Sequence, residues 1–144
     1  MHLLLFILIV INAILVGLIL VTQIVSYPLL LKVNKVNFFS YYVSYTNRIS
    51  IVVVPLMLFE VILTFLSYIY SPINTLIQLS VFLLLLIWMS TFLIQVPLHN
   101  RLSLKFDENL INKLISTNSI RTFLWISKLV FLCIYYLHYY NEKI

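Results

Sequence analysis

Charged side chains are scarce in this chain of 144 residues, where Asp, Glu, Lys and Arg together make up 9% of the sequence. A soluble domain covers its surface with charge, and about a quarter of its residues carry one. Here 63% of the residues are hydrophobic and the mean hydropathy is +1.10. Because so few charges cannot cover a soluble protein, the composition predicts an integral membrane protein.

Glycine, cysteine and proline are rare as well, at 1, 1 and 4 residues. Such low glycine and proline contents exclude a collagen-like or low-complexity chain. The lone Cys133 cannot form an internal disulfide. The sequence has no nucleotide-binding glycine loop, no nucleophile elbow and no thiol pair, and its histidines lack the spacing of a metal or haem site. We therefore expect neither a metal nor another cofactor.

What the chain has instead is long apolar runs. A membrane-spanning helix needs about 20 mostly apolar residues, and the segments at about 3–31, 48–70, 73–97 and 122–140 meet this length. Backbone groups in lipid must be bonded within each segment, so the segments must be helical. The first segment lacks a basic start and a cleavage site, which makes it a retained helix rather than a signal peptide. The sequence predicts one all-α domain, residues 1–144, folded as an integral membrane four-helix bundle.

The connections between these segments are of two kinds. The tetrapeptide Ser71–Asn74 predicts a tight hairpin between spans two and three. Before span two, aromatic residues recur at spacings of three and four from Phe38 to Tyr45, which predicts that this helix extends beyond the membrane. Before span four, Asp107 is a typical N-cap and a stripe of Leu and Ile follows. This second pattern predicts a short amphipathic cytoplasmic helix lying on the membrane between spans three and four.

The positive charges predict the orientation in the membrane. Lysines and arginines gather in the first and third connections: Lys32, Lys35, Arg48, Arg101, Lys105, Lys113 and Arg121. The opposite side has only Lys143. The positive-inside rule therefore predicts cytoplasmic long loops and both termini outside, and we expect the inner membrane of a bacterium. No basic cluster or RNA-binding motif accompanies the net charge of +5, so the expected partner is the lipid bilayer and not nucleic acid.

Polar side chains from all four spans converge on the predicted cytoplasmic side. One interpretation is an active site, with His99 as base, Arg121 and Gln95 stabilising an anionic oxygen, and Asn118 binding the substrate. Aromatic side chains would line the pocket around a flat ring system: Tyr41, Tyr45, Trp88 and Trp125. The other interpretation is that these residues only anchor the helices at the membrane surface and pack them together.

Glu60 lies about 18 Å into the bilayer when residues are counted from Arg48. A carboxylate at that depth is costly and usually faces the interior of the bundle. Lys128 lies about 10 Å beyond Arg121, within reach of the same depth. We expect Glu60 and Lys128 to form a buried charge pair. The alternatives are a protonated Glu60 bonded to a neighbouring helix, or a role in proton transfer or substrate binding.

Two short motifs carry a resemblance to a known family. The stretch WMSTFLIQVPLHNRL, followed by NSIRTFLW, is similar to the small four-span membrane proteins grouped with the anthrone oxygenases. The resemblance covers mainly residues 88–125 and implies functional roles for six residues: Trp88, Pro97, His99, Asn118, Arg121 and Thr122. It also implies cofactor-independent oxygenation of a polyketide-like substrate. His99 stands where many relatives have Asn.

Three functions follow from these patterns. The first is an enzyme or binding protein for a lipophilic small molecule, held in the polar pocket on the cytoplasmic side. The second is an accessory or structural subunit whose helical faces contact other membrane subunits or further copies of this chain. The third is a transporter, which the sequence supports less because it shows no repeated halves.

Overall fold

The computed structural model describes residues 2–141. Two of its four long rods contain a π-helical turn: α1 (His2–Val21), η1 (Thr22–Ser26) and α2 (Tyr27–Leu30) form the first, and α4 (Thr75–Ser90), η2 (Thr91–Gln95) and α5 (Val96–Leu102) form the third. The second rod is α3 (Phe38–Tyr70) and the fourth is α6 (Glu108–Asn141). All four are long and apolar enough to cross a membrane. The predicted all-α four-helix bundle is therefore confirmed.

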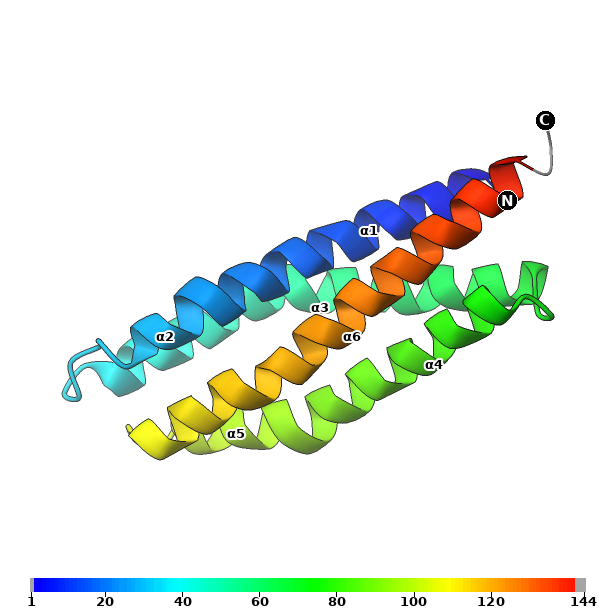
Figure 1. Ribbon diagram of the computed structural model, residues 1–144. Coiled ribbons are helices and arrows are strands. Elements are labelled where there is room, and N and C mark those ends of the chain that lie inside the picture. Colours follow the sequence, from blue (N-terminus) through cyan, green and yellow to red (C-terminus); the bar gives the residue numbers. More distant parts are fainter. Residues whose placement is uncertain (1, 142–144) are drawn as a thin grey trace.

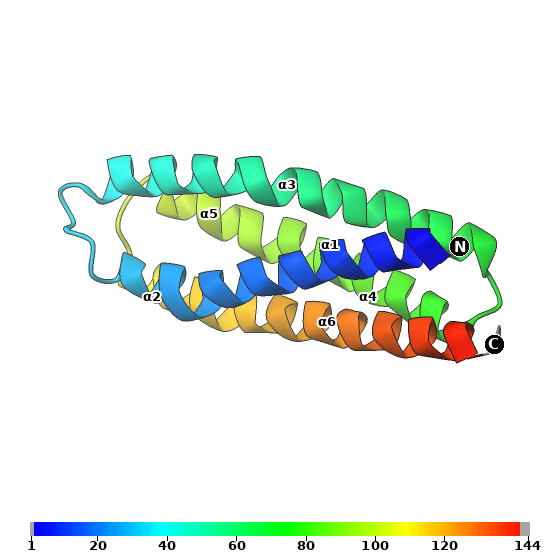
Figure 2. The same cartoon turned by 90° about the horizontal axis from the view of Figure 1, so that it is seen from above.

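The rods run up and down, each antiparallel to the next along the chain (Figures 1 and 2). The first rod packs against α3 and α6, and α4 packs against the same two helices, so α3 and α6 lie diagonally opposite each other. The hairpin between α3 and α4 lies at the end of the bundle where α1 begins (Figure 1). It is tight because the Asn74 side chain caps α4, accepting from the backbone N–H groups of Leu76 and Ile77.

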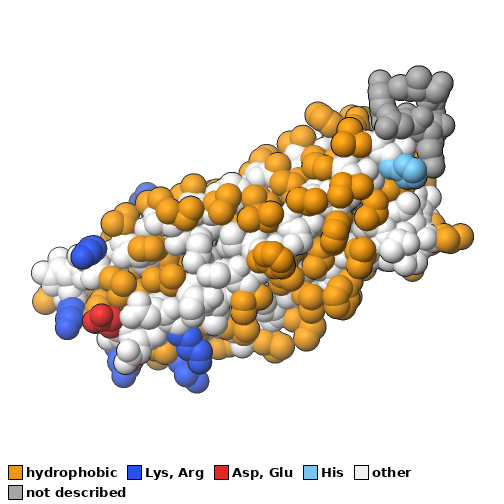
Figure 3. All heavy atoms as spheres, in the orientation of Figure 1, with side chains coloured by type: hydrophobic (Ala, Val, Ile, Leu, Met, Phe, Trp, Pro, Cys, Tyr) orange, Lys and Arg blue, Asp and Glu red, His pale blue; other side chains and the backbone are white. Residues whose placement is uncertain are grey.

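The face of the bundle seen in Figure 3 is apolar along most of its length, and Lys and Arg gather at one end. That end holds the two longer connections, and we call it the basic end; its exposed cations include Lys32, Lys35, Arg101, Lys105 and Lys113. An apolar band above a cationic end is the surface expected of a helical bundle embedded in lipid. Lys143, the basic residue predicted for the opposite side, lies outside the described residues.

The two π-helical turns precede prolines. Pro28 and Pro97 lack an N–H, and in an α-helix their rings would clash with the carbonyl four residues earlier. Each turn accommodates its proline by one extra residue, so that Tyr27 N–H bonds Thr22 C=O and Val96 N–H bonds Thr91 C=O. The hydroxyls of Thr22 and Thr91 donate to the carbonyls of Leu18 and Ile87 at 2.8 and 2.7 Å.

The separate surface helix predicted before span four is not present, because these residues form the first turns of the continuous α6. Asp107 does cap the helix, accepting from the N–H groups of Asn109 and Leu110. Ile111 and Leu114 are fully buried in a core cluster with Phe38 and Tyr42, so the apolar stripe packs inside the bundle instead of lying on lipid. The aromatic segment predicted to extend the helix of span two is helical, since α3 begins at Phe38.

Candidate functional site

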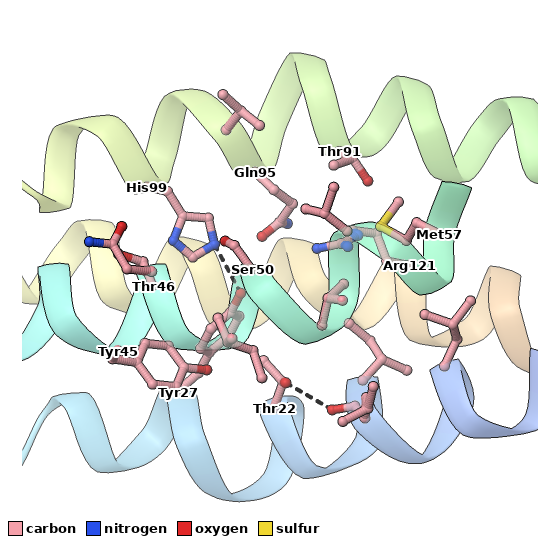
Figure 4. A pocket seen from close by; sticks show the side chains of 18 of the residues that line it. Thr22, Tyr27, Tyr45, Thr46, Ser50, Met57, Thr91, Gln95, His99 and Arg121 are labelled. Atoms are coloured by element: carbon pink, nitrogen blue, oxygen red, sulfur yellow. Dashed lines mark hydrogen bonds between the residues drawn. The ribbon is translucent and has the colours of Figure 1, made fainter. Parts of the chain in front are cut away.

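A cavity of about 490 Å³ lies between the four rods in the half of the bundle near the basic end. Figure 4 shows His99 and Gln95 reaching into it from one side and Tyr27 and Thr22 from the opposite side. Exposed residues line it on α3 (Ser50, Val54) and on α5 (Val96, Asn100), so the cavity opens to the exterior between these two helices. The polar groups predicted to converge from all four spans therefore surround an internal cavity, and this cavity opens at the side of the bundle.

Arg121 is the cation of this cavity. Its side chain is only 6% exposed, and within residues 2–141 no Asp or Glu forms an ion pair with it. One amine, Nη1, donates to Asn118 Oδ1 at 3.3 Å, and the guanidinium lies 5.0 Å from the centre of the Trp125 ring. Among the described residues Nε has no hydrogen-bond partner. A buried guanidinium held by one neutral amide and one aromatic face lacks the anion that usually accompanies it.

His99 is held between two tyrosines. Tyr42 Oη lies 2.6 Å from its Nδ1 and Tyr27 Oη lies 3.0 Å from its Nε2. A neutral imidazole has one N–H, so one hydroxyl accepts from the ring while the other donates to it. Tyr27 lines the cavity beside His99, whereas Tyr42 is buried among Phe38 and its neighbours. Because both ring nitrogens are occupied, His99 can exchange a proton with a molecule in the cavity only through a tyrosine hydroxyl.

Gln95 lines the cavity and has an acceptor that no described residue pairs with. Its Nε2 donates to Thr117 Oγ1 at 3.1 Å, and the Thr117 hydroxyl in turn donates to the Lys113 carbonyl at 2.7 Å. Since the only proton of that hydroxyl is used, it can accept only a donor from Gln95, which fixes the orientation of the amide. The remaining oxygen, Oε1, is buried without a partner in the described part of the chain.

A second polar cluster lies next to the cavity and shares Trp125 with its lining. Lys128 Nζ lies 2.7 Å from Glu60 Oε1 and 3.0 Å from Thr64 Oγ1. The amide of Asn12 also donates to this carboxylate, and the indole N–H of Trp125 lies 3.2 Å from both of its oxygens. All five side chains are buried. The pair expected from the sequence thus joins the diagonal helices α3 and α6, and Trp125 links it to Arg121.

The structure brings together some of the predicted site residues and leaves others apart. Gln95, His99, Arg121, Tyr45 and Trp125 line the cavity. Asn118 lies behind Arg121, where it also donates to Gln23 Oε1 at 2.8 Å. Tyr41 is exposed on the outside of α3, and Trp88 packs on Phe92 and the core, so neither lines the cavity.

Sequence reasoning missed the contributions of Tyr27 and Tyr42 to this site. A signal for the first exists in the sequence: Thr22–Leu29 and Thr91–Leu98 share the pattern Thr, five residues, Pro, Leu, and a basic residue follows three positions later in both. In this repeat Tyr27 aligns with Val96, which also lines the cavity, so the repeat relates two cavity-lining positions. No comparable signal distinguishes Tyr42 from the other tyrosines of its helix.

Within residues 2–141, no three His, Cys, Asp or Glu side chains come together to bind a metal ion. The chain was also compared with protein-family models, curated proteins and solved structures, and none of the three comparisons found a match.

Proposed function

We propose that this protein binds a lipophilic small molecule in the cavity at the basic end of the bundle. The observation that carries the proposal is the buried Arg121, which has no anionic partner in residues 2–141 and lines a space of about 490 Å³. That volume is in the range of pockets that enclose drug-sized molecules. Such pockets combine apolar walls with a few placed polar groups, and here Leu15, Ile19 and Met57 supply apolar wall.

The lateral opening between α3 and α5 favours a ligand that partitions into lipid. Val54 and Val96 line the cavity and are exposed on membrane-spanning helices, so a molecule dissolved in the bilayer would reach the cavity past two apolar side chains. The resemblance of residues 88–125 to the anthrone oxygenase group points to the same class of flat, lipophilic substrates.

A proton-transfer reaction on the bound molecule is a second candidate function. The chain Tyr27–His99–Tyr42 favours it, because the Tyr27 hydroxyl can take up a proton from the substrate while it passes its own proton to His99 Nε2, which leaves an imidazolium whose Nδ1–H donates to Tyr42. In this assignment Tyr27 contacts the substrate, and His99 exchanges a proton with Tyr27 without contacting the substrate. Arg121 then stabilises the negative charge that develops when the substrate loses its proton.

The test is native mass spectrometry of protein purified in mild detergent, with two tryptophan variants. Val54 and Val52 lie on the same helix, are each 48% exposed, and differ in that only Val54 lines the cavity. We expect wild type and Val52→Trp to carry the same bound small molecule, and Val54→Trp to have lost it.

Two results would contradict the proposal. The first is wild-type protein that carries no small molecule, and the second is equal occupancy in both tryptophan variants. Protein partners that co-purify with wild type, without any bound small molecule, would favour the accessory-subunit function instead.

A further inference from the structure

We infer that the molecule bound in this cavity is a lipophilic carboxylic acid, held as its carboxylate by Arg121. This inference rests on the proposed function and specifies the class of ligand. It follows from a charge count, from the unused donors of the guanidinium and from the depth of Arg121 in the bundle.

The charge count comes first. The buried charged side chains of residues 2–141 are Glu60, Arg121 and Lys128. Lys128 and Glu60 neutralise each other as an ion pair at 2.7 Å. Arg121 cannot shed its proton, so the interior of the bundle retains one uncompensated positive charge. An unpaired charge in a membrane-embedded interior is costly, and a monoanionic ligand removes that cost.

The geometry of the guanidinium then selects the anion. Asn118 accepts from Nη1, and Nε has no partner within residues 2–141, so the edge of the guanidinium that carries Nε has unused donors. Two parallel N–H donors match the two oxygens of a carboxylate, which is the bidentate geometry that arginine favours. The Trp125 ring, stacked at 5.0 Å and fixed through its N–H by Glu60, holds the guanidinium in this orientation.

The unpartnered Gln95 Oε1 adds a second requirement. An acceptor in the same cavity is satisfied by a hydroxyl or amine donor of the ligand, since a carboxylate oxygen would be repelled there. A lipophilic acid that also carries a hydroxyl group can bind Arg121 through its carboxylate and donate its hydroxyl proton to Gln95.

The anion could come from a free acid or from the headgroup of an anionic phospholipid. Arg121 lies eight residues beyond the exposed Lys113 on α6, about 12 Å deeper along the helix. A phosphate anchored at the membrane surface does not reach that depth without carrying its glycerol backbone into the bundle. The geometry therefore favours the free acid.

The experiment measures binding to the full-length protein in neutral detergent by thermal stabilisation. The probes are anthracene-2-carboxylate and palmitate, each compared with its own methyl ester, which has nearly the same shape and no charge. A ligand that binds only the folded state raises the midpoint of unfolding by an amount that grows with the logarithm of ligand concentration over Kd, so Kd follows from a titration. For at least one pair we expect the acid to bind tenfold or more tightly than its ester in wild type. Arg121→Gln should abolish the difference, and Arg121→Lys should reduce it.

Several outcomes overturn the inference. If no acid binds more tightly than its ester in wild type, the ligand is not an acid; this comparison holds even if the Arg121 variants do not fold. Stabilisation by nanodiscs containing phosphatidylglycerol over nanodiscs of phosphatidylcholine, without stabilisation by either free acid, would assign the site to a lipid headgroup. Esters that bind as well as acids, and lose binding in Val54→Trp, would refute the acid and leave the proposed function intact.

Discussion

At the scale of single residues, burial decides which polar groups matter. Glu60 and Lys128 are both fully buried and bonded to each other, to Asn12, to Thr64 and to Trp125. In a buried pair, the desolvation cost of the two ions offsets much of their attraction, whereas loss of one partner leaves an isolated charge. The intact pair therefore adds little net stability, but removing one of its two residues should destabilise the protein strongly.

Glu60→Leu alone should destabilise the protein by about 3–5 kcal/mol, because Lys128 remains buried without a counter-ion. The double variant Glu60→Leu with Lys128→Met should recover most of that loss. Thermal unfolding in detergent measures both. Lys113→Met, which removes an exposed lysine of the same helix, is the control and should change little. A double variant as unstable as the sum of the two single variants would mean that the residues do not act as partners.

Tyr42 and Tyr41 are neighbours in the sequence with opposite environments. Tyr42→Phe removes the partner of His99 Nδ1 in a buried setting, so we expect a loss of about 1–3 kcal/mol in the free energy of unfolding. Tyr41→Phe, at an exposed position, should stay within about 0.5 kcal/mol of wild type. Equal unfolding midpoints for the two variants would show that the contact between Tyr42 and His99 has no energetic weight.

The charge pair could be anticipated from the sequence, but the histidine contacts could not. Glu60 and Lys128 are conspicuous because charges are rare in apolar segments, and counting residues gives their depth. Tyr27 and His99 each follow a π-helical turn, which shifts later residues to another face of the helix, and Tyr42 contacts His99 from a third helix. The pattern of spacing that predicted one face for Gln95 and His99 assumes a regular helix, and it carries no information about how three rods approach one another.

At the scale of helices, the two π-helical turns shape the site. Thr22 belongs to η1, Thr91 and Gln95 belong to η2, and all three line the cavity. A π turn holds one residue more than an α turn, and such turns are frequent at functional sites. The cavity therefore lies where two helices depart from regular geometry in the same half of the bundle.

Removing the extra residue tests this role. Deletion of Phe92, a residue 57% exposed within η2, together with Pro97→Ala should join α4 and α5 into one regular helix. We expect a folded protein that no longer carries the small molecule in native mass spectrometry, because the widened turn that contributes Thr91 and Gln95 to the cavity lining is gone.

The matched control is deletion of Leu85, which is 58% exposed in the regular helix α4. Here no extra residue is available, so everything after the deletion turns by about 100° and the buried face is lost. This variant should fail to fold. If the Phe92 variant binds the small molecule as well as wild type does, the π turn is not needed for the site.

The helices themselves were largely predictable, since length and hydropathy locate four spans and the capping residues Asn74 and Asp107 mark two helix starts. The continuity of α6 was not predictable. An amphipathic stripe looks the same whether it lies on lipid or packs against another helix, and only the position of Phe38 and Tyr42 in the bundle decides between the two.

At the scale of the molecule, the two ends of the bundle differ. The even number of spans puts both chain ends at one end of the bundle, and the exposed cations lie at the other. The exposed cations lie at the basic end, where both long connections are, and the described parts of α1 and α6 start and finish at the other end (Figures 1 and 3). Applied to this arrangement, the positive-inside rule predicts that the basic end, and with it the cavity, faces the cytoplasm.

Reporter fusions check this orientation. We expect fusions at either terminus to report an external location, and a fusion inserted in the connection 103–107 to report the cytoplasm. Arg101→Gln with Lys105→Gln should weaken the preference without reversing it, since Lys32, Lys35 and Lys113 remain. If both termini were in the cytoplasm, the cavity would lie in the opposite leaflet and the predicted orientation would be wrong.

We propose that a lipophilic molecule occupies the cavity against Arg121. An experimental density map of the protein purified from native membranes would show that molecule. We predict non-protein density between the α3–α5 opening and the guanidinium, within hydrogen-bonding distance of Arg121 Nε and Gln95 Oε1. A cavity filled by side chains or by ordered water alone, or Arg121 paired with a carboxylate of this chain, would contradict it.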